Sequence, residues 1–389
     1  MHMKFLLAIG PILLLIHSVQ AQMPGVFKEA AAVLRTSVLQ EADSALTAKP
    51  VTVTAYRSAR SAGGPHDFFS EGDYWWPDPQ NPQGPYIQRD GMTNPDNFVE
   101  HRIAMIRFSR IMGVLASAYL LTKEDKYAEQ AFVHARAWLV DTATRMNPHM
   151  LYAQAIKGRF TGRGIGIIDM IQFMEVSQAL KKLESARSAK PAEYAAFRHW
   201  FDEYLRWVTT HKYGIDEKNA LNNHGTCWTM QVAGFASFTG NKALLDTCRN
   251  RYRNIHLPDQ MAANGGFPKE LARTKPYGYS LFNLDAMAMI CQILSDRKQN
   301  LWTFQTPDQR SIEKGIRFLY PYVADKQRWP YKQDVMYWDD WPVAQPFLLF
   351  GAMAFRKKNW LQTWKQLNHV PVVPEIIRNL PVRHPLIWF

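Results

Sequence analysis

The chain has few cysteines and none of the common metal-binding motifs. Only three of its 389 residues are cysteine, Cys227, Cys248 and Cys291, and an odd number leaves at least one thiol unpaired. A disulfide scaffold is therefore excluded. The sequence contains no HExxH motif, no closely spaced cysteine pair and no EF-hand loop, and its histidines are scattered. We accordingly predict no metal site and no cofactor.

Long apolar runs are also lacking. Residues 1–4 are a short basic segment, residues 5–18 are apolar and residues 19–21 form a small-residue cleavage site, which is the pattern of an export signal. The apolar stretch is shorter than the roughly 20 residues that a membrane-spanning helix needs, and no later uncharged segment reaches that length. We expect a signal peptide at 1–21, a mature chain of 22–389 that is periplasmic or secreted, and no membrane span.

Acidic residues are in deficit. The chain has 34 Asp and Glu against 46 Lys and Arg, which gives a formal charge of +12. Such an excess attracts polyanions over long distances, although it would also serve solubility alone. No recognisable nucleic-acid-binding module is present. For an exported chain, the charge favours an acidic polysaccharide as partner rather than nucleic acid. We expect the chain to be a monomer or a homodimer.

Alternating runs of Val, Ile and Thr, which strands need, are missing. Apolar residues instead recur at helical spacing. The segments with this pattern are 26–46, 101–121, 126–139, 165–183, 192–211, 226–238, 242–255, 279–294, 306–323 and 344–357. No linker divides them, so we predict an all-α fold with one domain, in which helical hairpins form an incomplete (α/α) toroid. The tail 370–389, rich in Pro and Arg, is expected to lie extended over the surface.

One long segment has no helical periodicity. Residues 50–95 are rich in Pro, Gly, Asp and aromatic residues, and a loop of that length inside a compact domain is usually functional. We expect residues 68–86 to form a lid or subsite wall, with Tyr74 pointing into a cleft. Trp75 and Trp76 are expected to stack on sugar rings or, alternatively, to anchor the loop.

Two short motifs precede apolar helical segments. The first is Asn222-Asn223-His224-Gly225, which is expected on the loop before the helix; its alternative role is a helix cap. The second runs from Glu270 to Tyr279 and contains Arg273 and Lys275. Together the motifs supply an amide, an imidazole, a guanidinium and a phenol.

These groups fit β-elimination from a uronic acid. The C5 proton is too weakly acidic to remove unless the charge that develops on the neighbouring carboxylate is neutralised, which Asn223 and Arg273 can do. A base must then take the proton and an acid must protonate the departing O4, and His224 and Tyr279 can fill these roles. Because a free tyrosine has a pKa near 10, Tyr279 would need cations such as Arg273 and Lys275 beside it to act as a base.

Three segments resemble the alginate lyase superfamily with an (α/α) toroid fold, which includes polysaccharide lyase families 5 and 38. They are YAQAIKGRFTGRGIGIID at 152–169, NNHG at 222–225 and LARTKPYGYSLF at 271–282. The spacing from Arg273 to Tyr279 is one residue shorter than in family 5, and DYWWPDP has no clear counterpart there, so family 38 is favoured. The resemblance implies a lyase for β-1,4-linked polyuronate, either mannuronate in alginate or glucuronan.

The resemblance also implies roles for the four motif residues. Asn223 and Arg273 would neutralise the carboxylate, and His224 and Tyr279 would handle protons. In the syn elimination of mannuronate or glucuronate, Tyr279 would be both base and acid while His224 assists neutralisation. A C5 epimer would present its proton on the opposite face, and His224 could then be the base.

Further basic and polar residues are candidates for substrate binding. Gln154, Arg159 and Arg163 are expected to contact carboxylates or hydroxyls in additional subsites, because arginine binds carboxylates with two parallel hydrogen bonds. Lys275 is placed with them as a cation near the substrate. The alternative for Gln154, Arg159 and Arg163 is a solvated surface position.

Two other functions compete with the lyase. A glycoside hydrolase on a similar toroid would need two opposed carboxyl groups, for which Asp339 and Asp340 with Asp73 or Asp78 are the candidates. A non-catalytic exported protein that binds polyanions would explain the charge and the aromatic residues. It would leave the four motif residues without a purpose.

Overall fold

A computed structural model describes residues 23–389 of the chain. The predicted signal peptide, residues 1–21, lies outside the described residues. Within them the structure is built mainly from α-helices, so the predicted all-α class is confirmed. The helices are α1 Met23–Ala45, α2 Glu100–Thr122, α3 Asp125–Leu139, α4 Phe173–Leu183, α5 Pro191–Thr210, α6 Lys212–Lys218, α7 Asn223–Thr239, α8 Lys242–Arg251, α9 Leu257–Gln260, α10 Pro268–Leu271, α11 Pro276–Leu294, α12 Ile312–Ala324, α13 Pro346–Phe355, α14 Lys358–Gln366 and α15 Pro374–Arg378.

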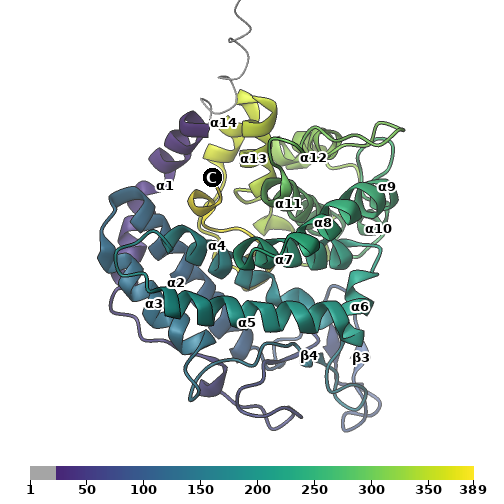
Figure 1. The fold of residues 1–389 in the computed structure, drawn as a ribbon. Coiled ribbons are helices and arrows are strands. Elements are labelled where there is room, and N and C mark those ends of the chain that lie inside the picture. The colour runs from purple at the N-terminus through teal and green to yellow at the C-terminus, as the bar shows by residue number, and fades with distance from the viewer. Residues whose placement is uncertain (1–22) are drawn as a thin grey trace, which may run out of the picture.

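The helices form an incomplete double ring. Helices α2, α4, α7, α11 and α13 contact one another in that order, and α3, α5, α8, α12 and α14 pack outside them (Figure 1). The inner helices α7 and α11 are buried along most of their length, as an apolar composition on all sides requires. The outer helix α5 buries one face only. This arrangement confirms the predicted (α/α) toroid.

Helix α2 is long and apolar enough to cross a membrane by length and composition alone. In the structure, 72% of that apolar window is buried inside the protein. The helix packs against α1, α3 and α4. It is therefore a core helix of the double ring.

Two pairs of short strands lie at one end of the ring, below α5 in Figure 1. Strand β1 Phe69–Glu71 pairs in parallel with β4 Tyr152–Ala155, and β2 Trp75–Trp76 pairs antiparallel with β3 Ile87–Gln88. Three of these strands belong to the segment 50–95, which we expected to be irregular. The expectation of no extensive sheet holds for residues 23–389, because each sheet has two strands only.

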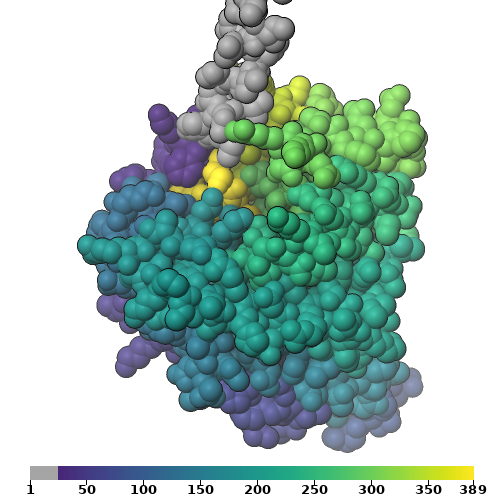
Figure 2. Space-filling view, in the orientation of Figure 1, coloured from purple at the N-terminus to yellow at the C-terminus, as the bar shows by residue number. Residues whose placement is uncertain are grey.

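The C-terminal tail is not an extended surface segment, so that prediction was wrong. Its residues form α15 and a 3-10 turn, η6 Pro385–Trp388, which packs against α1, α2 and α4 and fills the gap in the ring. Figure 2 shows yellow C-terminal residues between the purple and green parts of the surface. The physical reason is the apolar sequence Leu386-Ile387-Trp388, whose side chains are all buried. Glu175 on α4 holds the segment by accepting backbone hydrogen bonds from Arg383 and His384.

Several helix boundaries differ from the predicted ones. Residues 165–183 are a 3-10 segment, η2 Gly164–Gln172, followed by α4 rather than one helix. The segment 306–323 becomes helical only at Ile312, where Ser311 caps the helix through its side chain. The short helices α6, α14 and α15 were not predicted, because each presents too few turns for a clear apolar period.

Candidate active site

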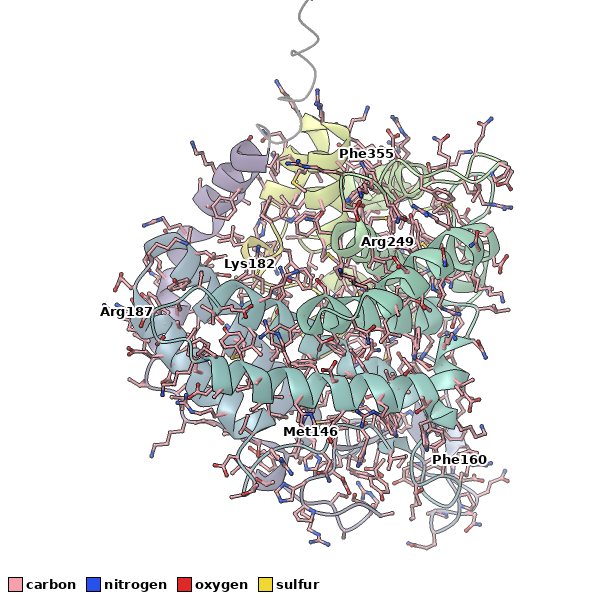
Figure 3. All side chains as sticks on the ribbon, viewed as in Figure 1. Met146, Phe160, Lys182, Arg187, Arg249 and Phe355 are labelled. Carbon is pink, nitrogen blue, oxygen red and sulfur yellow. The ribbon has the colours of Figure 1, made fainter. Side chains whose placement is uncertain are left out.

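A cleft opens at the end of the ring that carries the strands, and together with its open mouth it encloses about 620 Å³ of empty space. Phe160, in the turn after β4, marks this end of the molecule in Figure 3. The cleft is built from the aromatic loop, from β4 and the segment after it, and from the first turns of α7 and α11 with the end of α15. Its lining residues are Asp73, Tyr74, Trp75, Gln88, Asp90, Gln154, Arg163, Ile165, Ile168, Asn223, His224, Arg273, Tyr279, Phe282, Arg378 and Asn379.

Asn223 and His224 are the first two residues of α7, not part of the loop before it. Asn223 does not serve as the helix cap. Glu270 fixes it instead, by accepting hydrogen bonds from its backbone N–H at 2.7 Å and from its side-chain Nδ2 at 2.8 Å. The glycine that follows is required, because a Cβ on Gly225 would lie 2.1 Å from the carbonyl oxygen of Ala220.

His224 is held in one orientation by a buried carboxylate. Its Nδ1 lies 2.8 Å from Oε1 of Glu217, whose side chain is fully buried, and this leaves the imidazole Nε2 for the cleft. Burial alone would lower the pKa of His224, but the adjacent Glu217 carboxylate raises it above the ordinary histidine value. The site therefore favours the imidazolium form.

Arg273 forms a cation–π pair with Tyr279, which belongs to the same sequence motif. The guanidinium carbon of Arg273 lies 4.6 Å from the centre of the Tyr279 ring. Asp90, from the loop after β3, fixes Arg273 by accepting hydrogen bonds from its Nη2 at 2.8 Å and Nε at 3.3 Å. Arg273 is thus presented to the phenol as a fixed cation.

The hydroxyl of Tyr279 donates a hydrogen bond of 2.8 Å to the hydroxyl of Tyr74 in the aromatic loop. Burial raises the pKa of Tyr279 above the ordinary tyrosine value, while the positive charge of Arg273 acts against that rise. Burial and the nearby Glu375 carboxylate also raise the pKa of Tyr74. Both phenols are therefore protonated at neutral pH in the substrate-free site.

The structure brings the four motif residues together. Asn223, His224, Arg273 and Tyr279 all line the cleft, although 56 residues of sequence separate the first from the last. An imidazole and a phenol that opened onto different surfaces would have contradicted the lyase prediction. Their common cleft meets this geometric requirement.

Four of the residues expected to bind substrate also line the cleft: Tyr74, Trp75, Gln154 and Arg163. Arg163 lies 5.7 Å from the centre of the Trp75 ring, and its Nε donates to the backbone oxygen of Gln154 at 2.9 Å. Within residues 23–389 no carboxylate forms an ion pair with Arg163. Burial lowers its pKa to about 10, so it remains a cation that faces the cleft.

Three predicted substrate contacts do not line the cleft. Trp76 lies outside it, with Nε1 donating to the backbone oxygen of Met92, so it anchors the loop. Arg159 lies 5.5 Å from the centre of the Trp75 ring on the loop side and donates to the backbone oxygen of Tyr86. Lys275 is buried and ion-paired with Glu375, which removes its charge from direct contact with a ligand in this cleft.

A network of buried charges in the cleft wall and behind it was not predicted from the sequence. Arg378 pairs with Asp73 at 2.7 Å and with Glu375 at 3.3 Å, and Arg102 pairs with Asp73 at 2.7 Å and with Asp169 at 3.1 Å. The spacing of Glu375 and Arg378, three residues apart, is the one available sign of a short helix with paired charges. Nothing in the sequence indicates that this helix lies against the aromatic loop.

The carboxylates needed by a glycoside hydrolase are not arranged as a pair. Asp339 and Asp340 are exposed and lie outside the cleft. Asp73 does line the cleft, but both of its oxygens form ion pairs with arginines. Asp78 also lies outside the cleft. The hydrolase alternative therefore has no support in this site.

Comparisons with known proteins identify the family and the fold. The model of the family described as alginate lyase matches residues 52–329. The chain is similar to the crystal structure of an alginate lyase from Bacteroides ovatus, with 30% sequence identity and a TM-score of 0.80 over 95% of this chain and 97% of that one. No curated protein sequence matches the chain.

More distant structures share the fold. Alginate lyase A1-III from Sphingomonas species A1 is 14% identical with a TM-score of 0.53, over 83% of this chain and 88% of that one. A substituted form of alginate lyase A1-III complexed with a tetrasaccharide is 13% identical with a TM-score of 0.55, over 81% of this chain and 82% of that one. At these identities the likeness supports the toroid architecture.

Proposed function

The chain belongs to the alginate lyase family, and from this premise we propose that it cleaves alginate by β-elimination in the cleft between α7, α11 and the aromatic loop. The observation that carries the proposal is the convergence of His224 and Tyr279 on one cleft, each with its own charged partner. We still expect the chain to be more closely related to polysaccharide lyase family 38 than to family 5. The pattern of residues 1–21 supports export to the periplasm or the medium.

Neutralisation of the substrate carboxylate is assigned to Asn223 and His224. Asn223 is fixed by Glu270, and His224 is fixed by Glu217 with its pKa raised, so the imidazolium presents a positive N–H to the cleft. Fixed donors of this kind stabilise the charge that moves onto the carboxylate as the C5 proton departs. Arg273 is already paired with Asp90, so its charge acts mainly on Tyr279.

Proton transfer is assigned to Tyr279. As the phenolate, it takes the proton from C5; the electrons of that C–H bond form the C4–C5 double bond, and the C4–O4 bond breaks. Tyr279 then returns the proton to O4, so the enzyme is regenerated without a co-reactant. Arg273 stabilises the phenolate by its charge, and the Tyr74 hydroxyl does so once its hydrogen turns from Glu375 to Tyr279.

Recognition of a neighbouring sugar is assigned to Arg163 and Trp75. Arg163 has no carboxylate partner of its own within residues 23–389, and its guanidinium lies against the Trp75 ring in the cleft wall. A uronate next to the reacting sugar offers both a carboxylate and an apolar ring face. These two residues match the two features.

The test is to follow the near-ultraviolet absorbance of the unsaturated uronate produced by the full mature chain. Polymannuronate, polyguluronate and glucuronan are offered side by side, with Tyr279→Phe as the matched control. We expect absorbance to rise on alginate blocks with the wild type alone. Reducing ends that appear without this absorbance would indicate hydrolysis and refute the proposal.

A further inference from the structure

Behind the two tyrosines lies a buried cation in an aromatic cage. The Nζ of Lys275 lies 4.8 Å from the ring centre of Tyr74, 5.4 Å from that of Tyr279 and 5.3 Å from that of Tyr337. Lys275 is also ion-paired with Glu375 on α15, and both residues are almost completely buried. A charged pair so far from solvent is costly unless it has a specific role or strong partners.

Glu375 is joined to Tyr279 by a chain of hydrogen bonds. The Tyr279 hydroxyl donates to the Tyr74 hydroxyl at 2.8 Å, and the Tyr74 hydroxyl donates to Oε1 of Glu375 at 3.2 Å. The same Oε1 accepts from Lys275, while Oε2 pairs with Arg378 at 3.3 Å. Tyr74 has a single hydroxyl hydrogen, so it cannot donate to Glu375 and to a Tyr279 phenolate at the same time.

We propose that Glu375 is a positioning residue that competes with the Tyr279 phenolate for the hydroxyl hydrogen of Tyr74, and that Lys275 and Arg378 weaken this competition by pairing with Glu375. The inference rests on the lyase function proposed above. It makes the C-terminal helix α15 part of the active site, although α15 contributes no group to the proton transfer itself.

Glu375 does not store the proton. Lys275 and Arg378 outweigh the effect of burial and hold the pKa of Glu375 at about 2. An ordinary phenol has a pKa near 10, so a carboxylate this acidic cannot take a proton from tyrosine to a useful extent. Its influence is confined to charge and to the direction in which the Tyr74 hydrogen points.

Because of this competition, Glu375 and Lys275 have opposite effects on the pKa of Tyr279. Removing the negative charge of Glu375 frees the Tyr74 hydrogen for the phenolate and lowers the pKa of Tyr279. Removing Lys275 strengthens Glu375 as an acceptor, takes a cation away from the phenol and raises that pKa. The charged and titratable groups that surround Tyr279 are Arg273, Lys275, Asp90, Tyr74, Glu375 and His224, and the same pockets are also lined by Asp73, Arg163, Asp334, Tyr337 and Arg378.

The experiment compares the pH dependence of kcat/KM on alginate for Glu375→Gln and Lys275→Met. The high-pH limb is the one that Tyr279 sets, because its pKa lies above that of His224. We expect this limb to move to lower pH in Glu375→Gln and to higher pH in Lys275→Met, each by about one pH unit, the scale on which a charge at this distance acts. Glu175→Gln is the matched control, since Glu175 is equally buried and holds the same tail through Arg383 and His384.

The control should lower the melting temperature and leave the limb in place. Shifts of Glu375→Gln and Lys275→Met in the same direction, or no shift in either folded variant, would overturn the inference. Where Glu375→Gln does not fold, Lys275→Met decides by the sign of its shift alone. A wild type that yields no unsaturated product would instead refute the proposed function, so the two failures are distinct.

Discussion

The positive charge of His224 is favoured chiefly by the buried carboxylate of Glu217, and Glu217→Gln removes this carboxylate with little change in shape. Glutamine keeps an oxygen that can accept from Nδ1 of His224 at the present 2.8 Å, but it has no negative charge. Burial then dominates, and the pKa of His224 falls. In the proposed mechanism the active form combines the His224 imidazolium with the Tyr279 phenolate, so fewer molecules carry that combination.

The magnitude follows from the strength of a charge-assisted hydrogen bond. Such a bond contributes about 1.5–3 kcal/mol, which corresponds to a decrease of about ten- to hundredfold in the population of the active form. Between the pKa of His224 and that of Tyr279, kcat/KM should fall by this factor, and the low-pH limb should move to lower pH. Below that limb His224 is protonated in both enzymes, so their rates should coincide.

The assay is the initial rate of unsaturated product at low substrate concentration, from pH 4 upwards, for the wild type and Glu217→Gln. Glu203→Gln is the control, because Glu203 pairs with His199 on the exposed face of α5 at 3.7 Å. It should leave the whole profile unchanged. A Glu217→Gln enzyme that is slower by the same factor at every pH would refute the reasoning, because that result indicates a purely structural role.

The same linkage affects stability. The pKa of His224 is raised in the folded state, so the contribution of the pair is present in full at low pH and is lost as the pH rises through the folded pKa. The difference in unfolding free energy between the wild type and Glu217→Gln should therefore be larger at pH 5 than at pH 9. Chemical denaturation at the two pH values measures it.

Three further predictions concern other residues. Tyr279→Phe should lower kcat by at least about a thousandfold, since it removes both base and acid, while a tetrasaccharide should still bind in calorimetry. Arg163→Met should raise KM for alginate about ten- to hundredfold through the loss of a charge-assisted contact, with a smaller effect at high salt, as steady-state kinetics will show. Asp285 is buried with one oxygen unpaired, and its pKa is raised. Because a carboxyl group with a raised pKa costs stability as the pH increases, Asp285→Asn should increase the melting temperature more at pH 8 than at pH 5. A larger gain at pH 5 would contradict this assignment.

The helical architecture was readable from the sequence because it depends on local patterns. Apolar residues on all sides of 226–238 and 279–294 predicted buried helices, and these became the inner helices α7 and α11. The helix boundaries were predicted less accurately than the helices themselves. The segment 165–183 shows this, since Gly164–Gln172 winds as a 3-10 helix although its apolar spacing fits an α-helix.

The chemical types at the site were also present in the sequence. Asn223, His224, Arg273 and Tyr279 stood at the starts of two helices, and only their residue types and order were needed to suggest elimination. Their partners could not be found in this way. Nothing in the sequence distinguishes Glu270, Glu217 and Asp90 from other acidic residues. Each belongs to the site only because it forms a hydrogen bond with one of the motif residues, Asn223, His224 or Arg273.

Sequence alone therefore determined the toroid class, the excess positive charge and the four polar groups, because each follows from composition or from short-range order. Tertiary structure decided which charges are free. It places Arg163 in the cleft without a carboxylate partner among the described residues, and it buries Lys275 against Glu375. The physical reason is that burial and ion pairing depend on contacts between distant segments, such as those of Glu375 with Tyr74 and of Arg378 with Asp73.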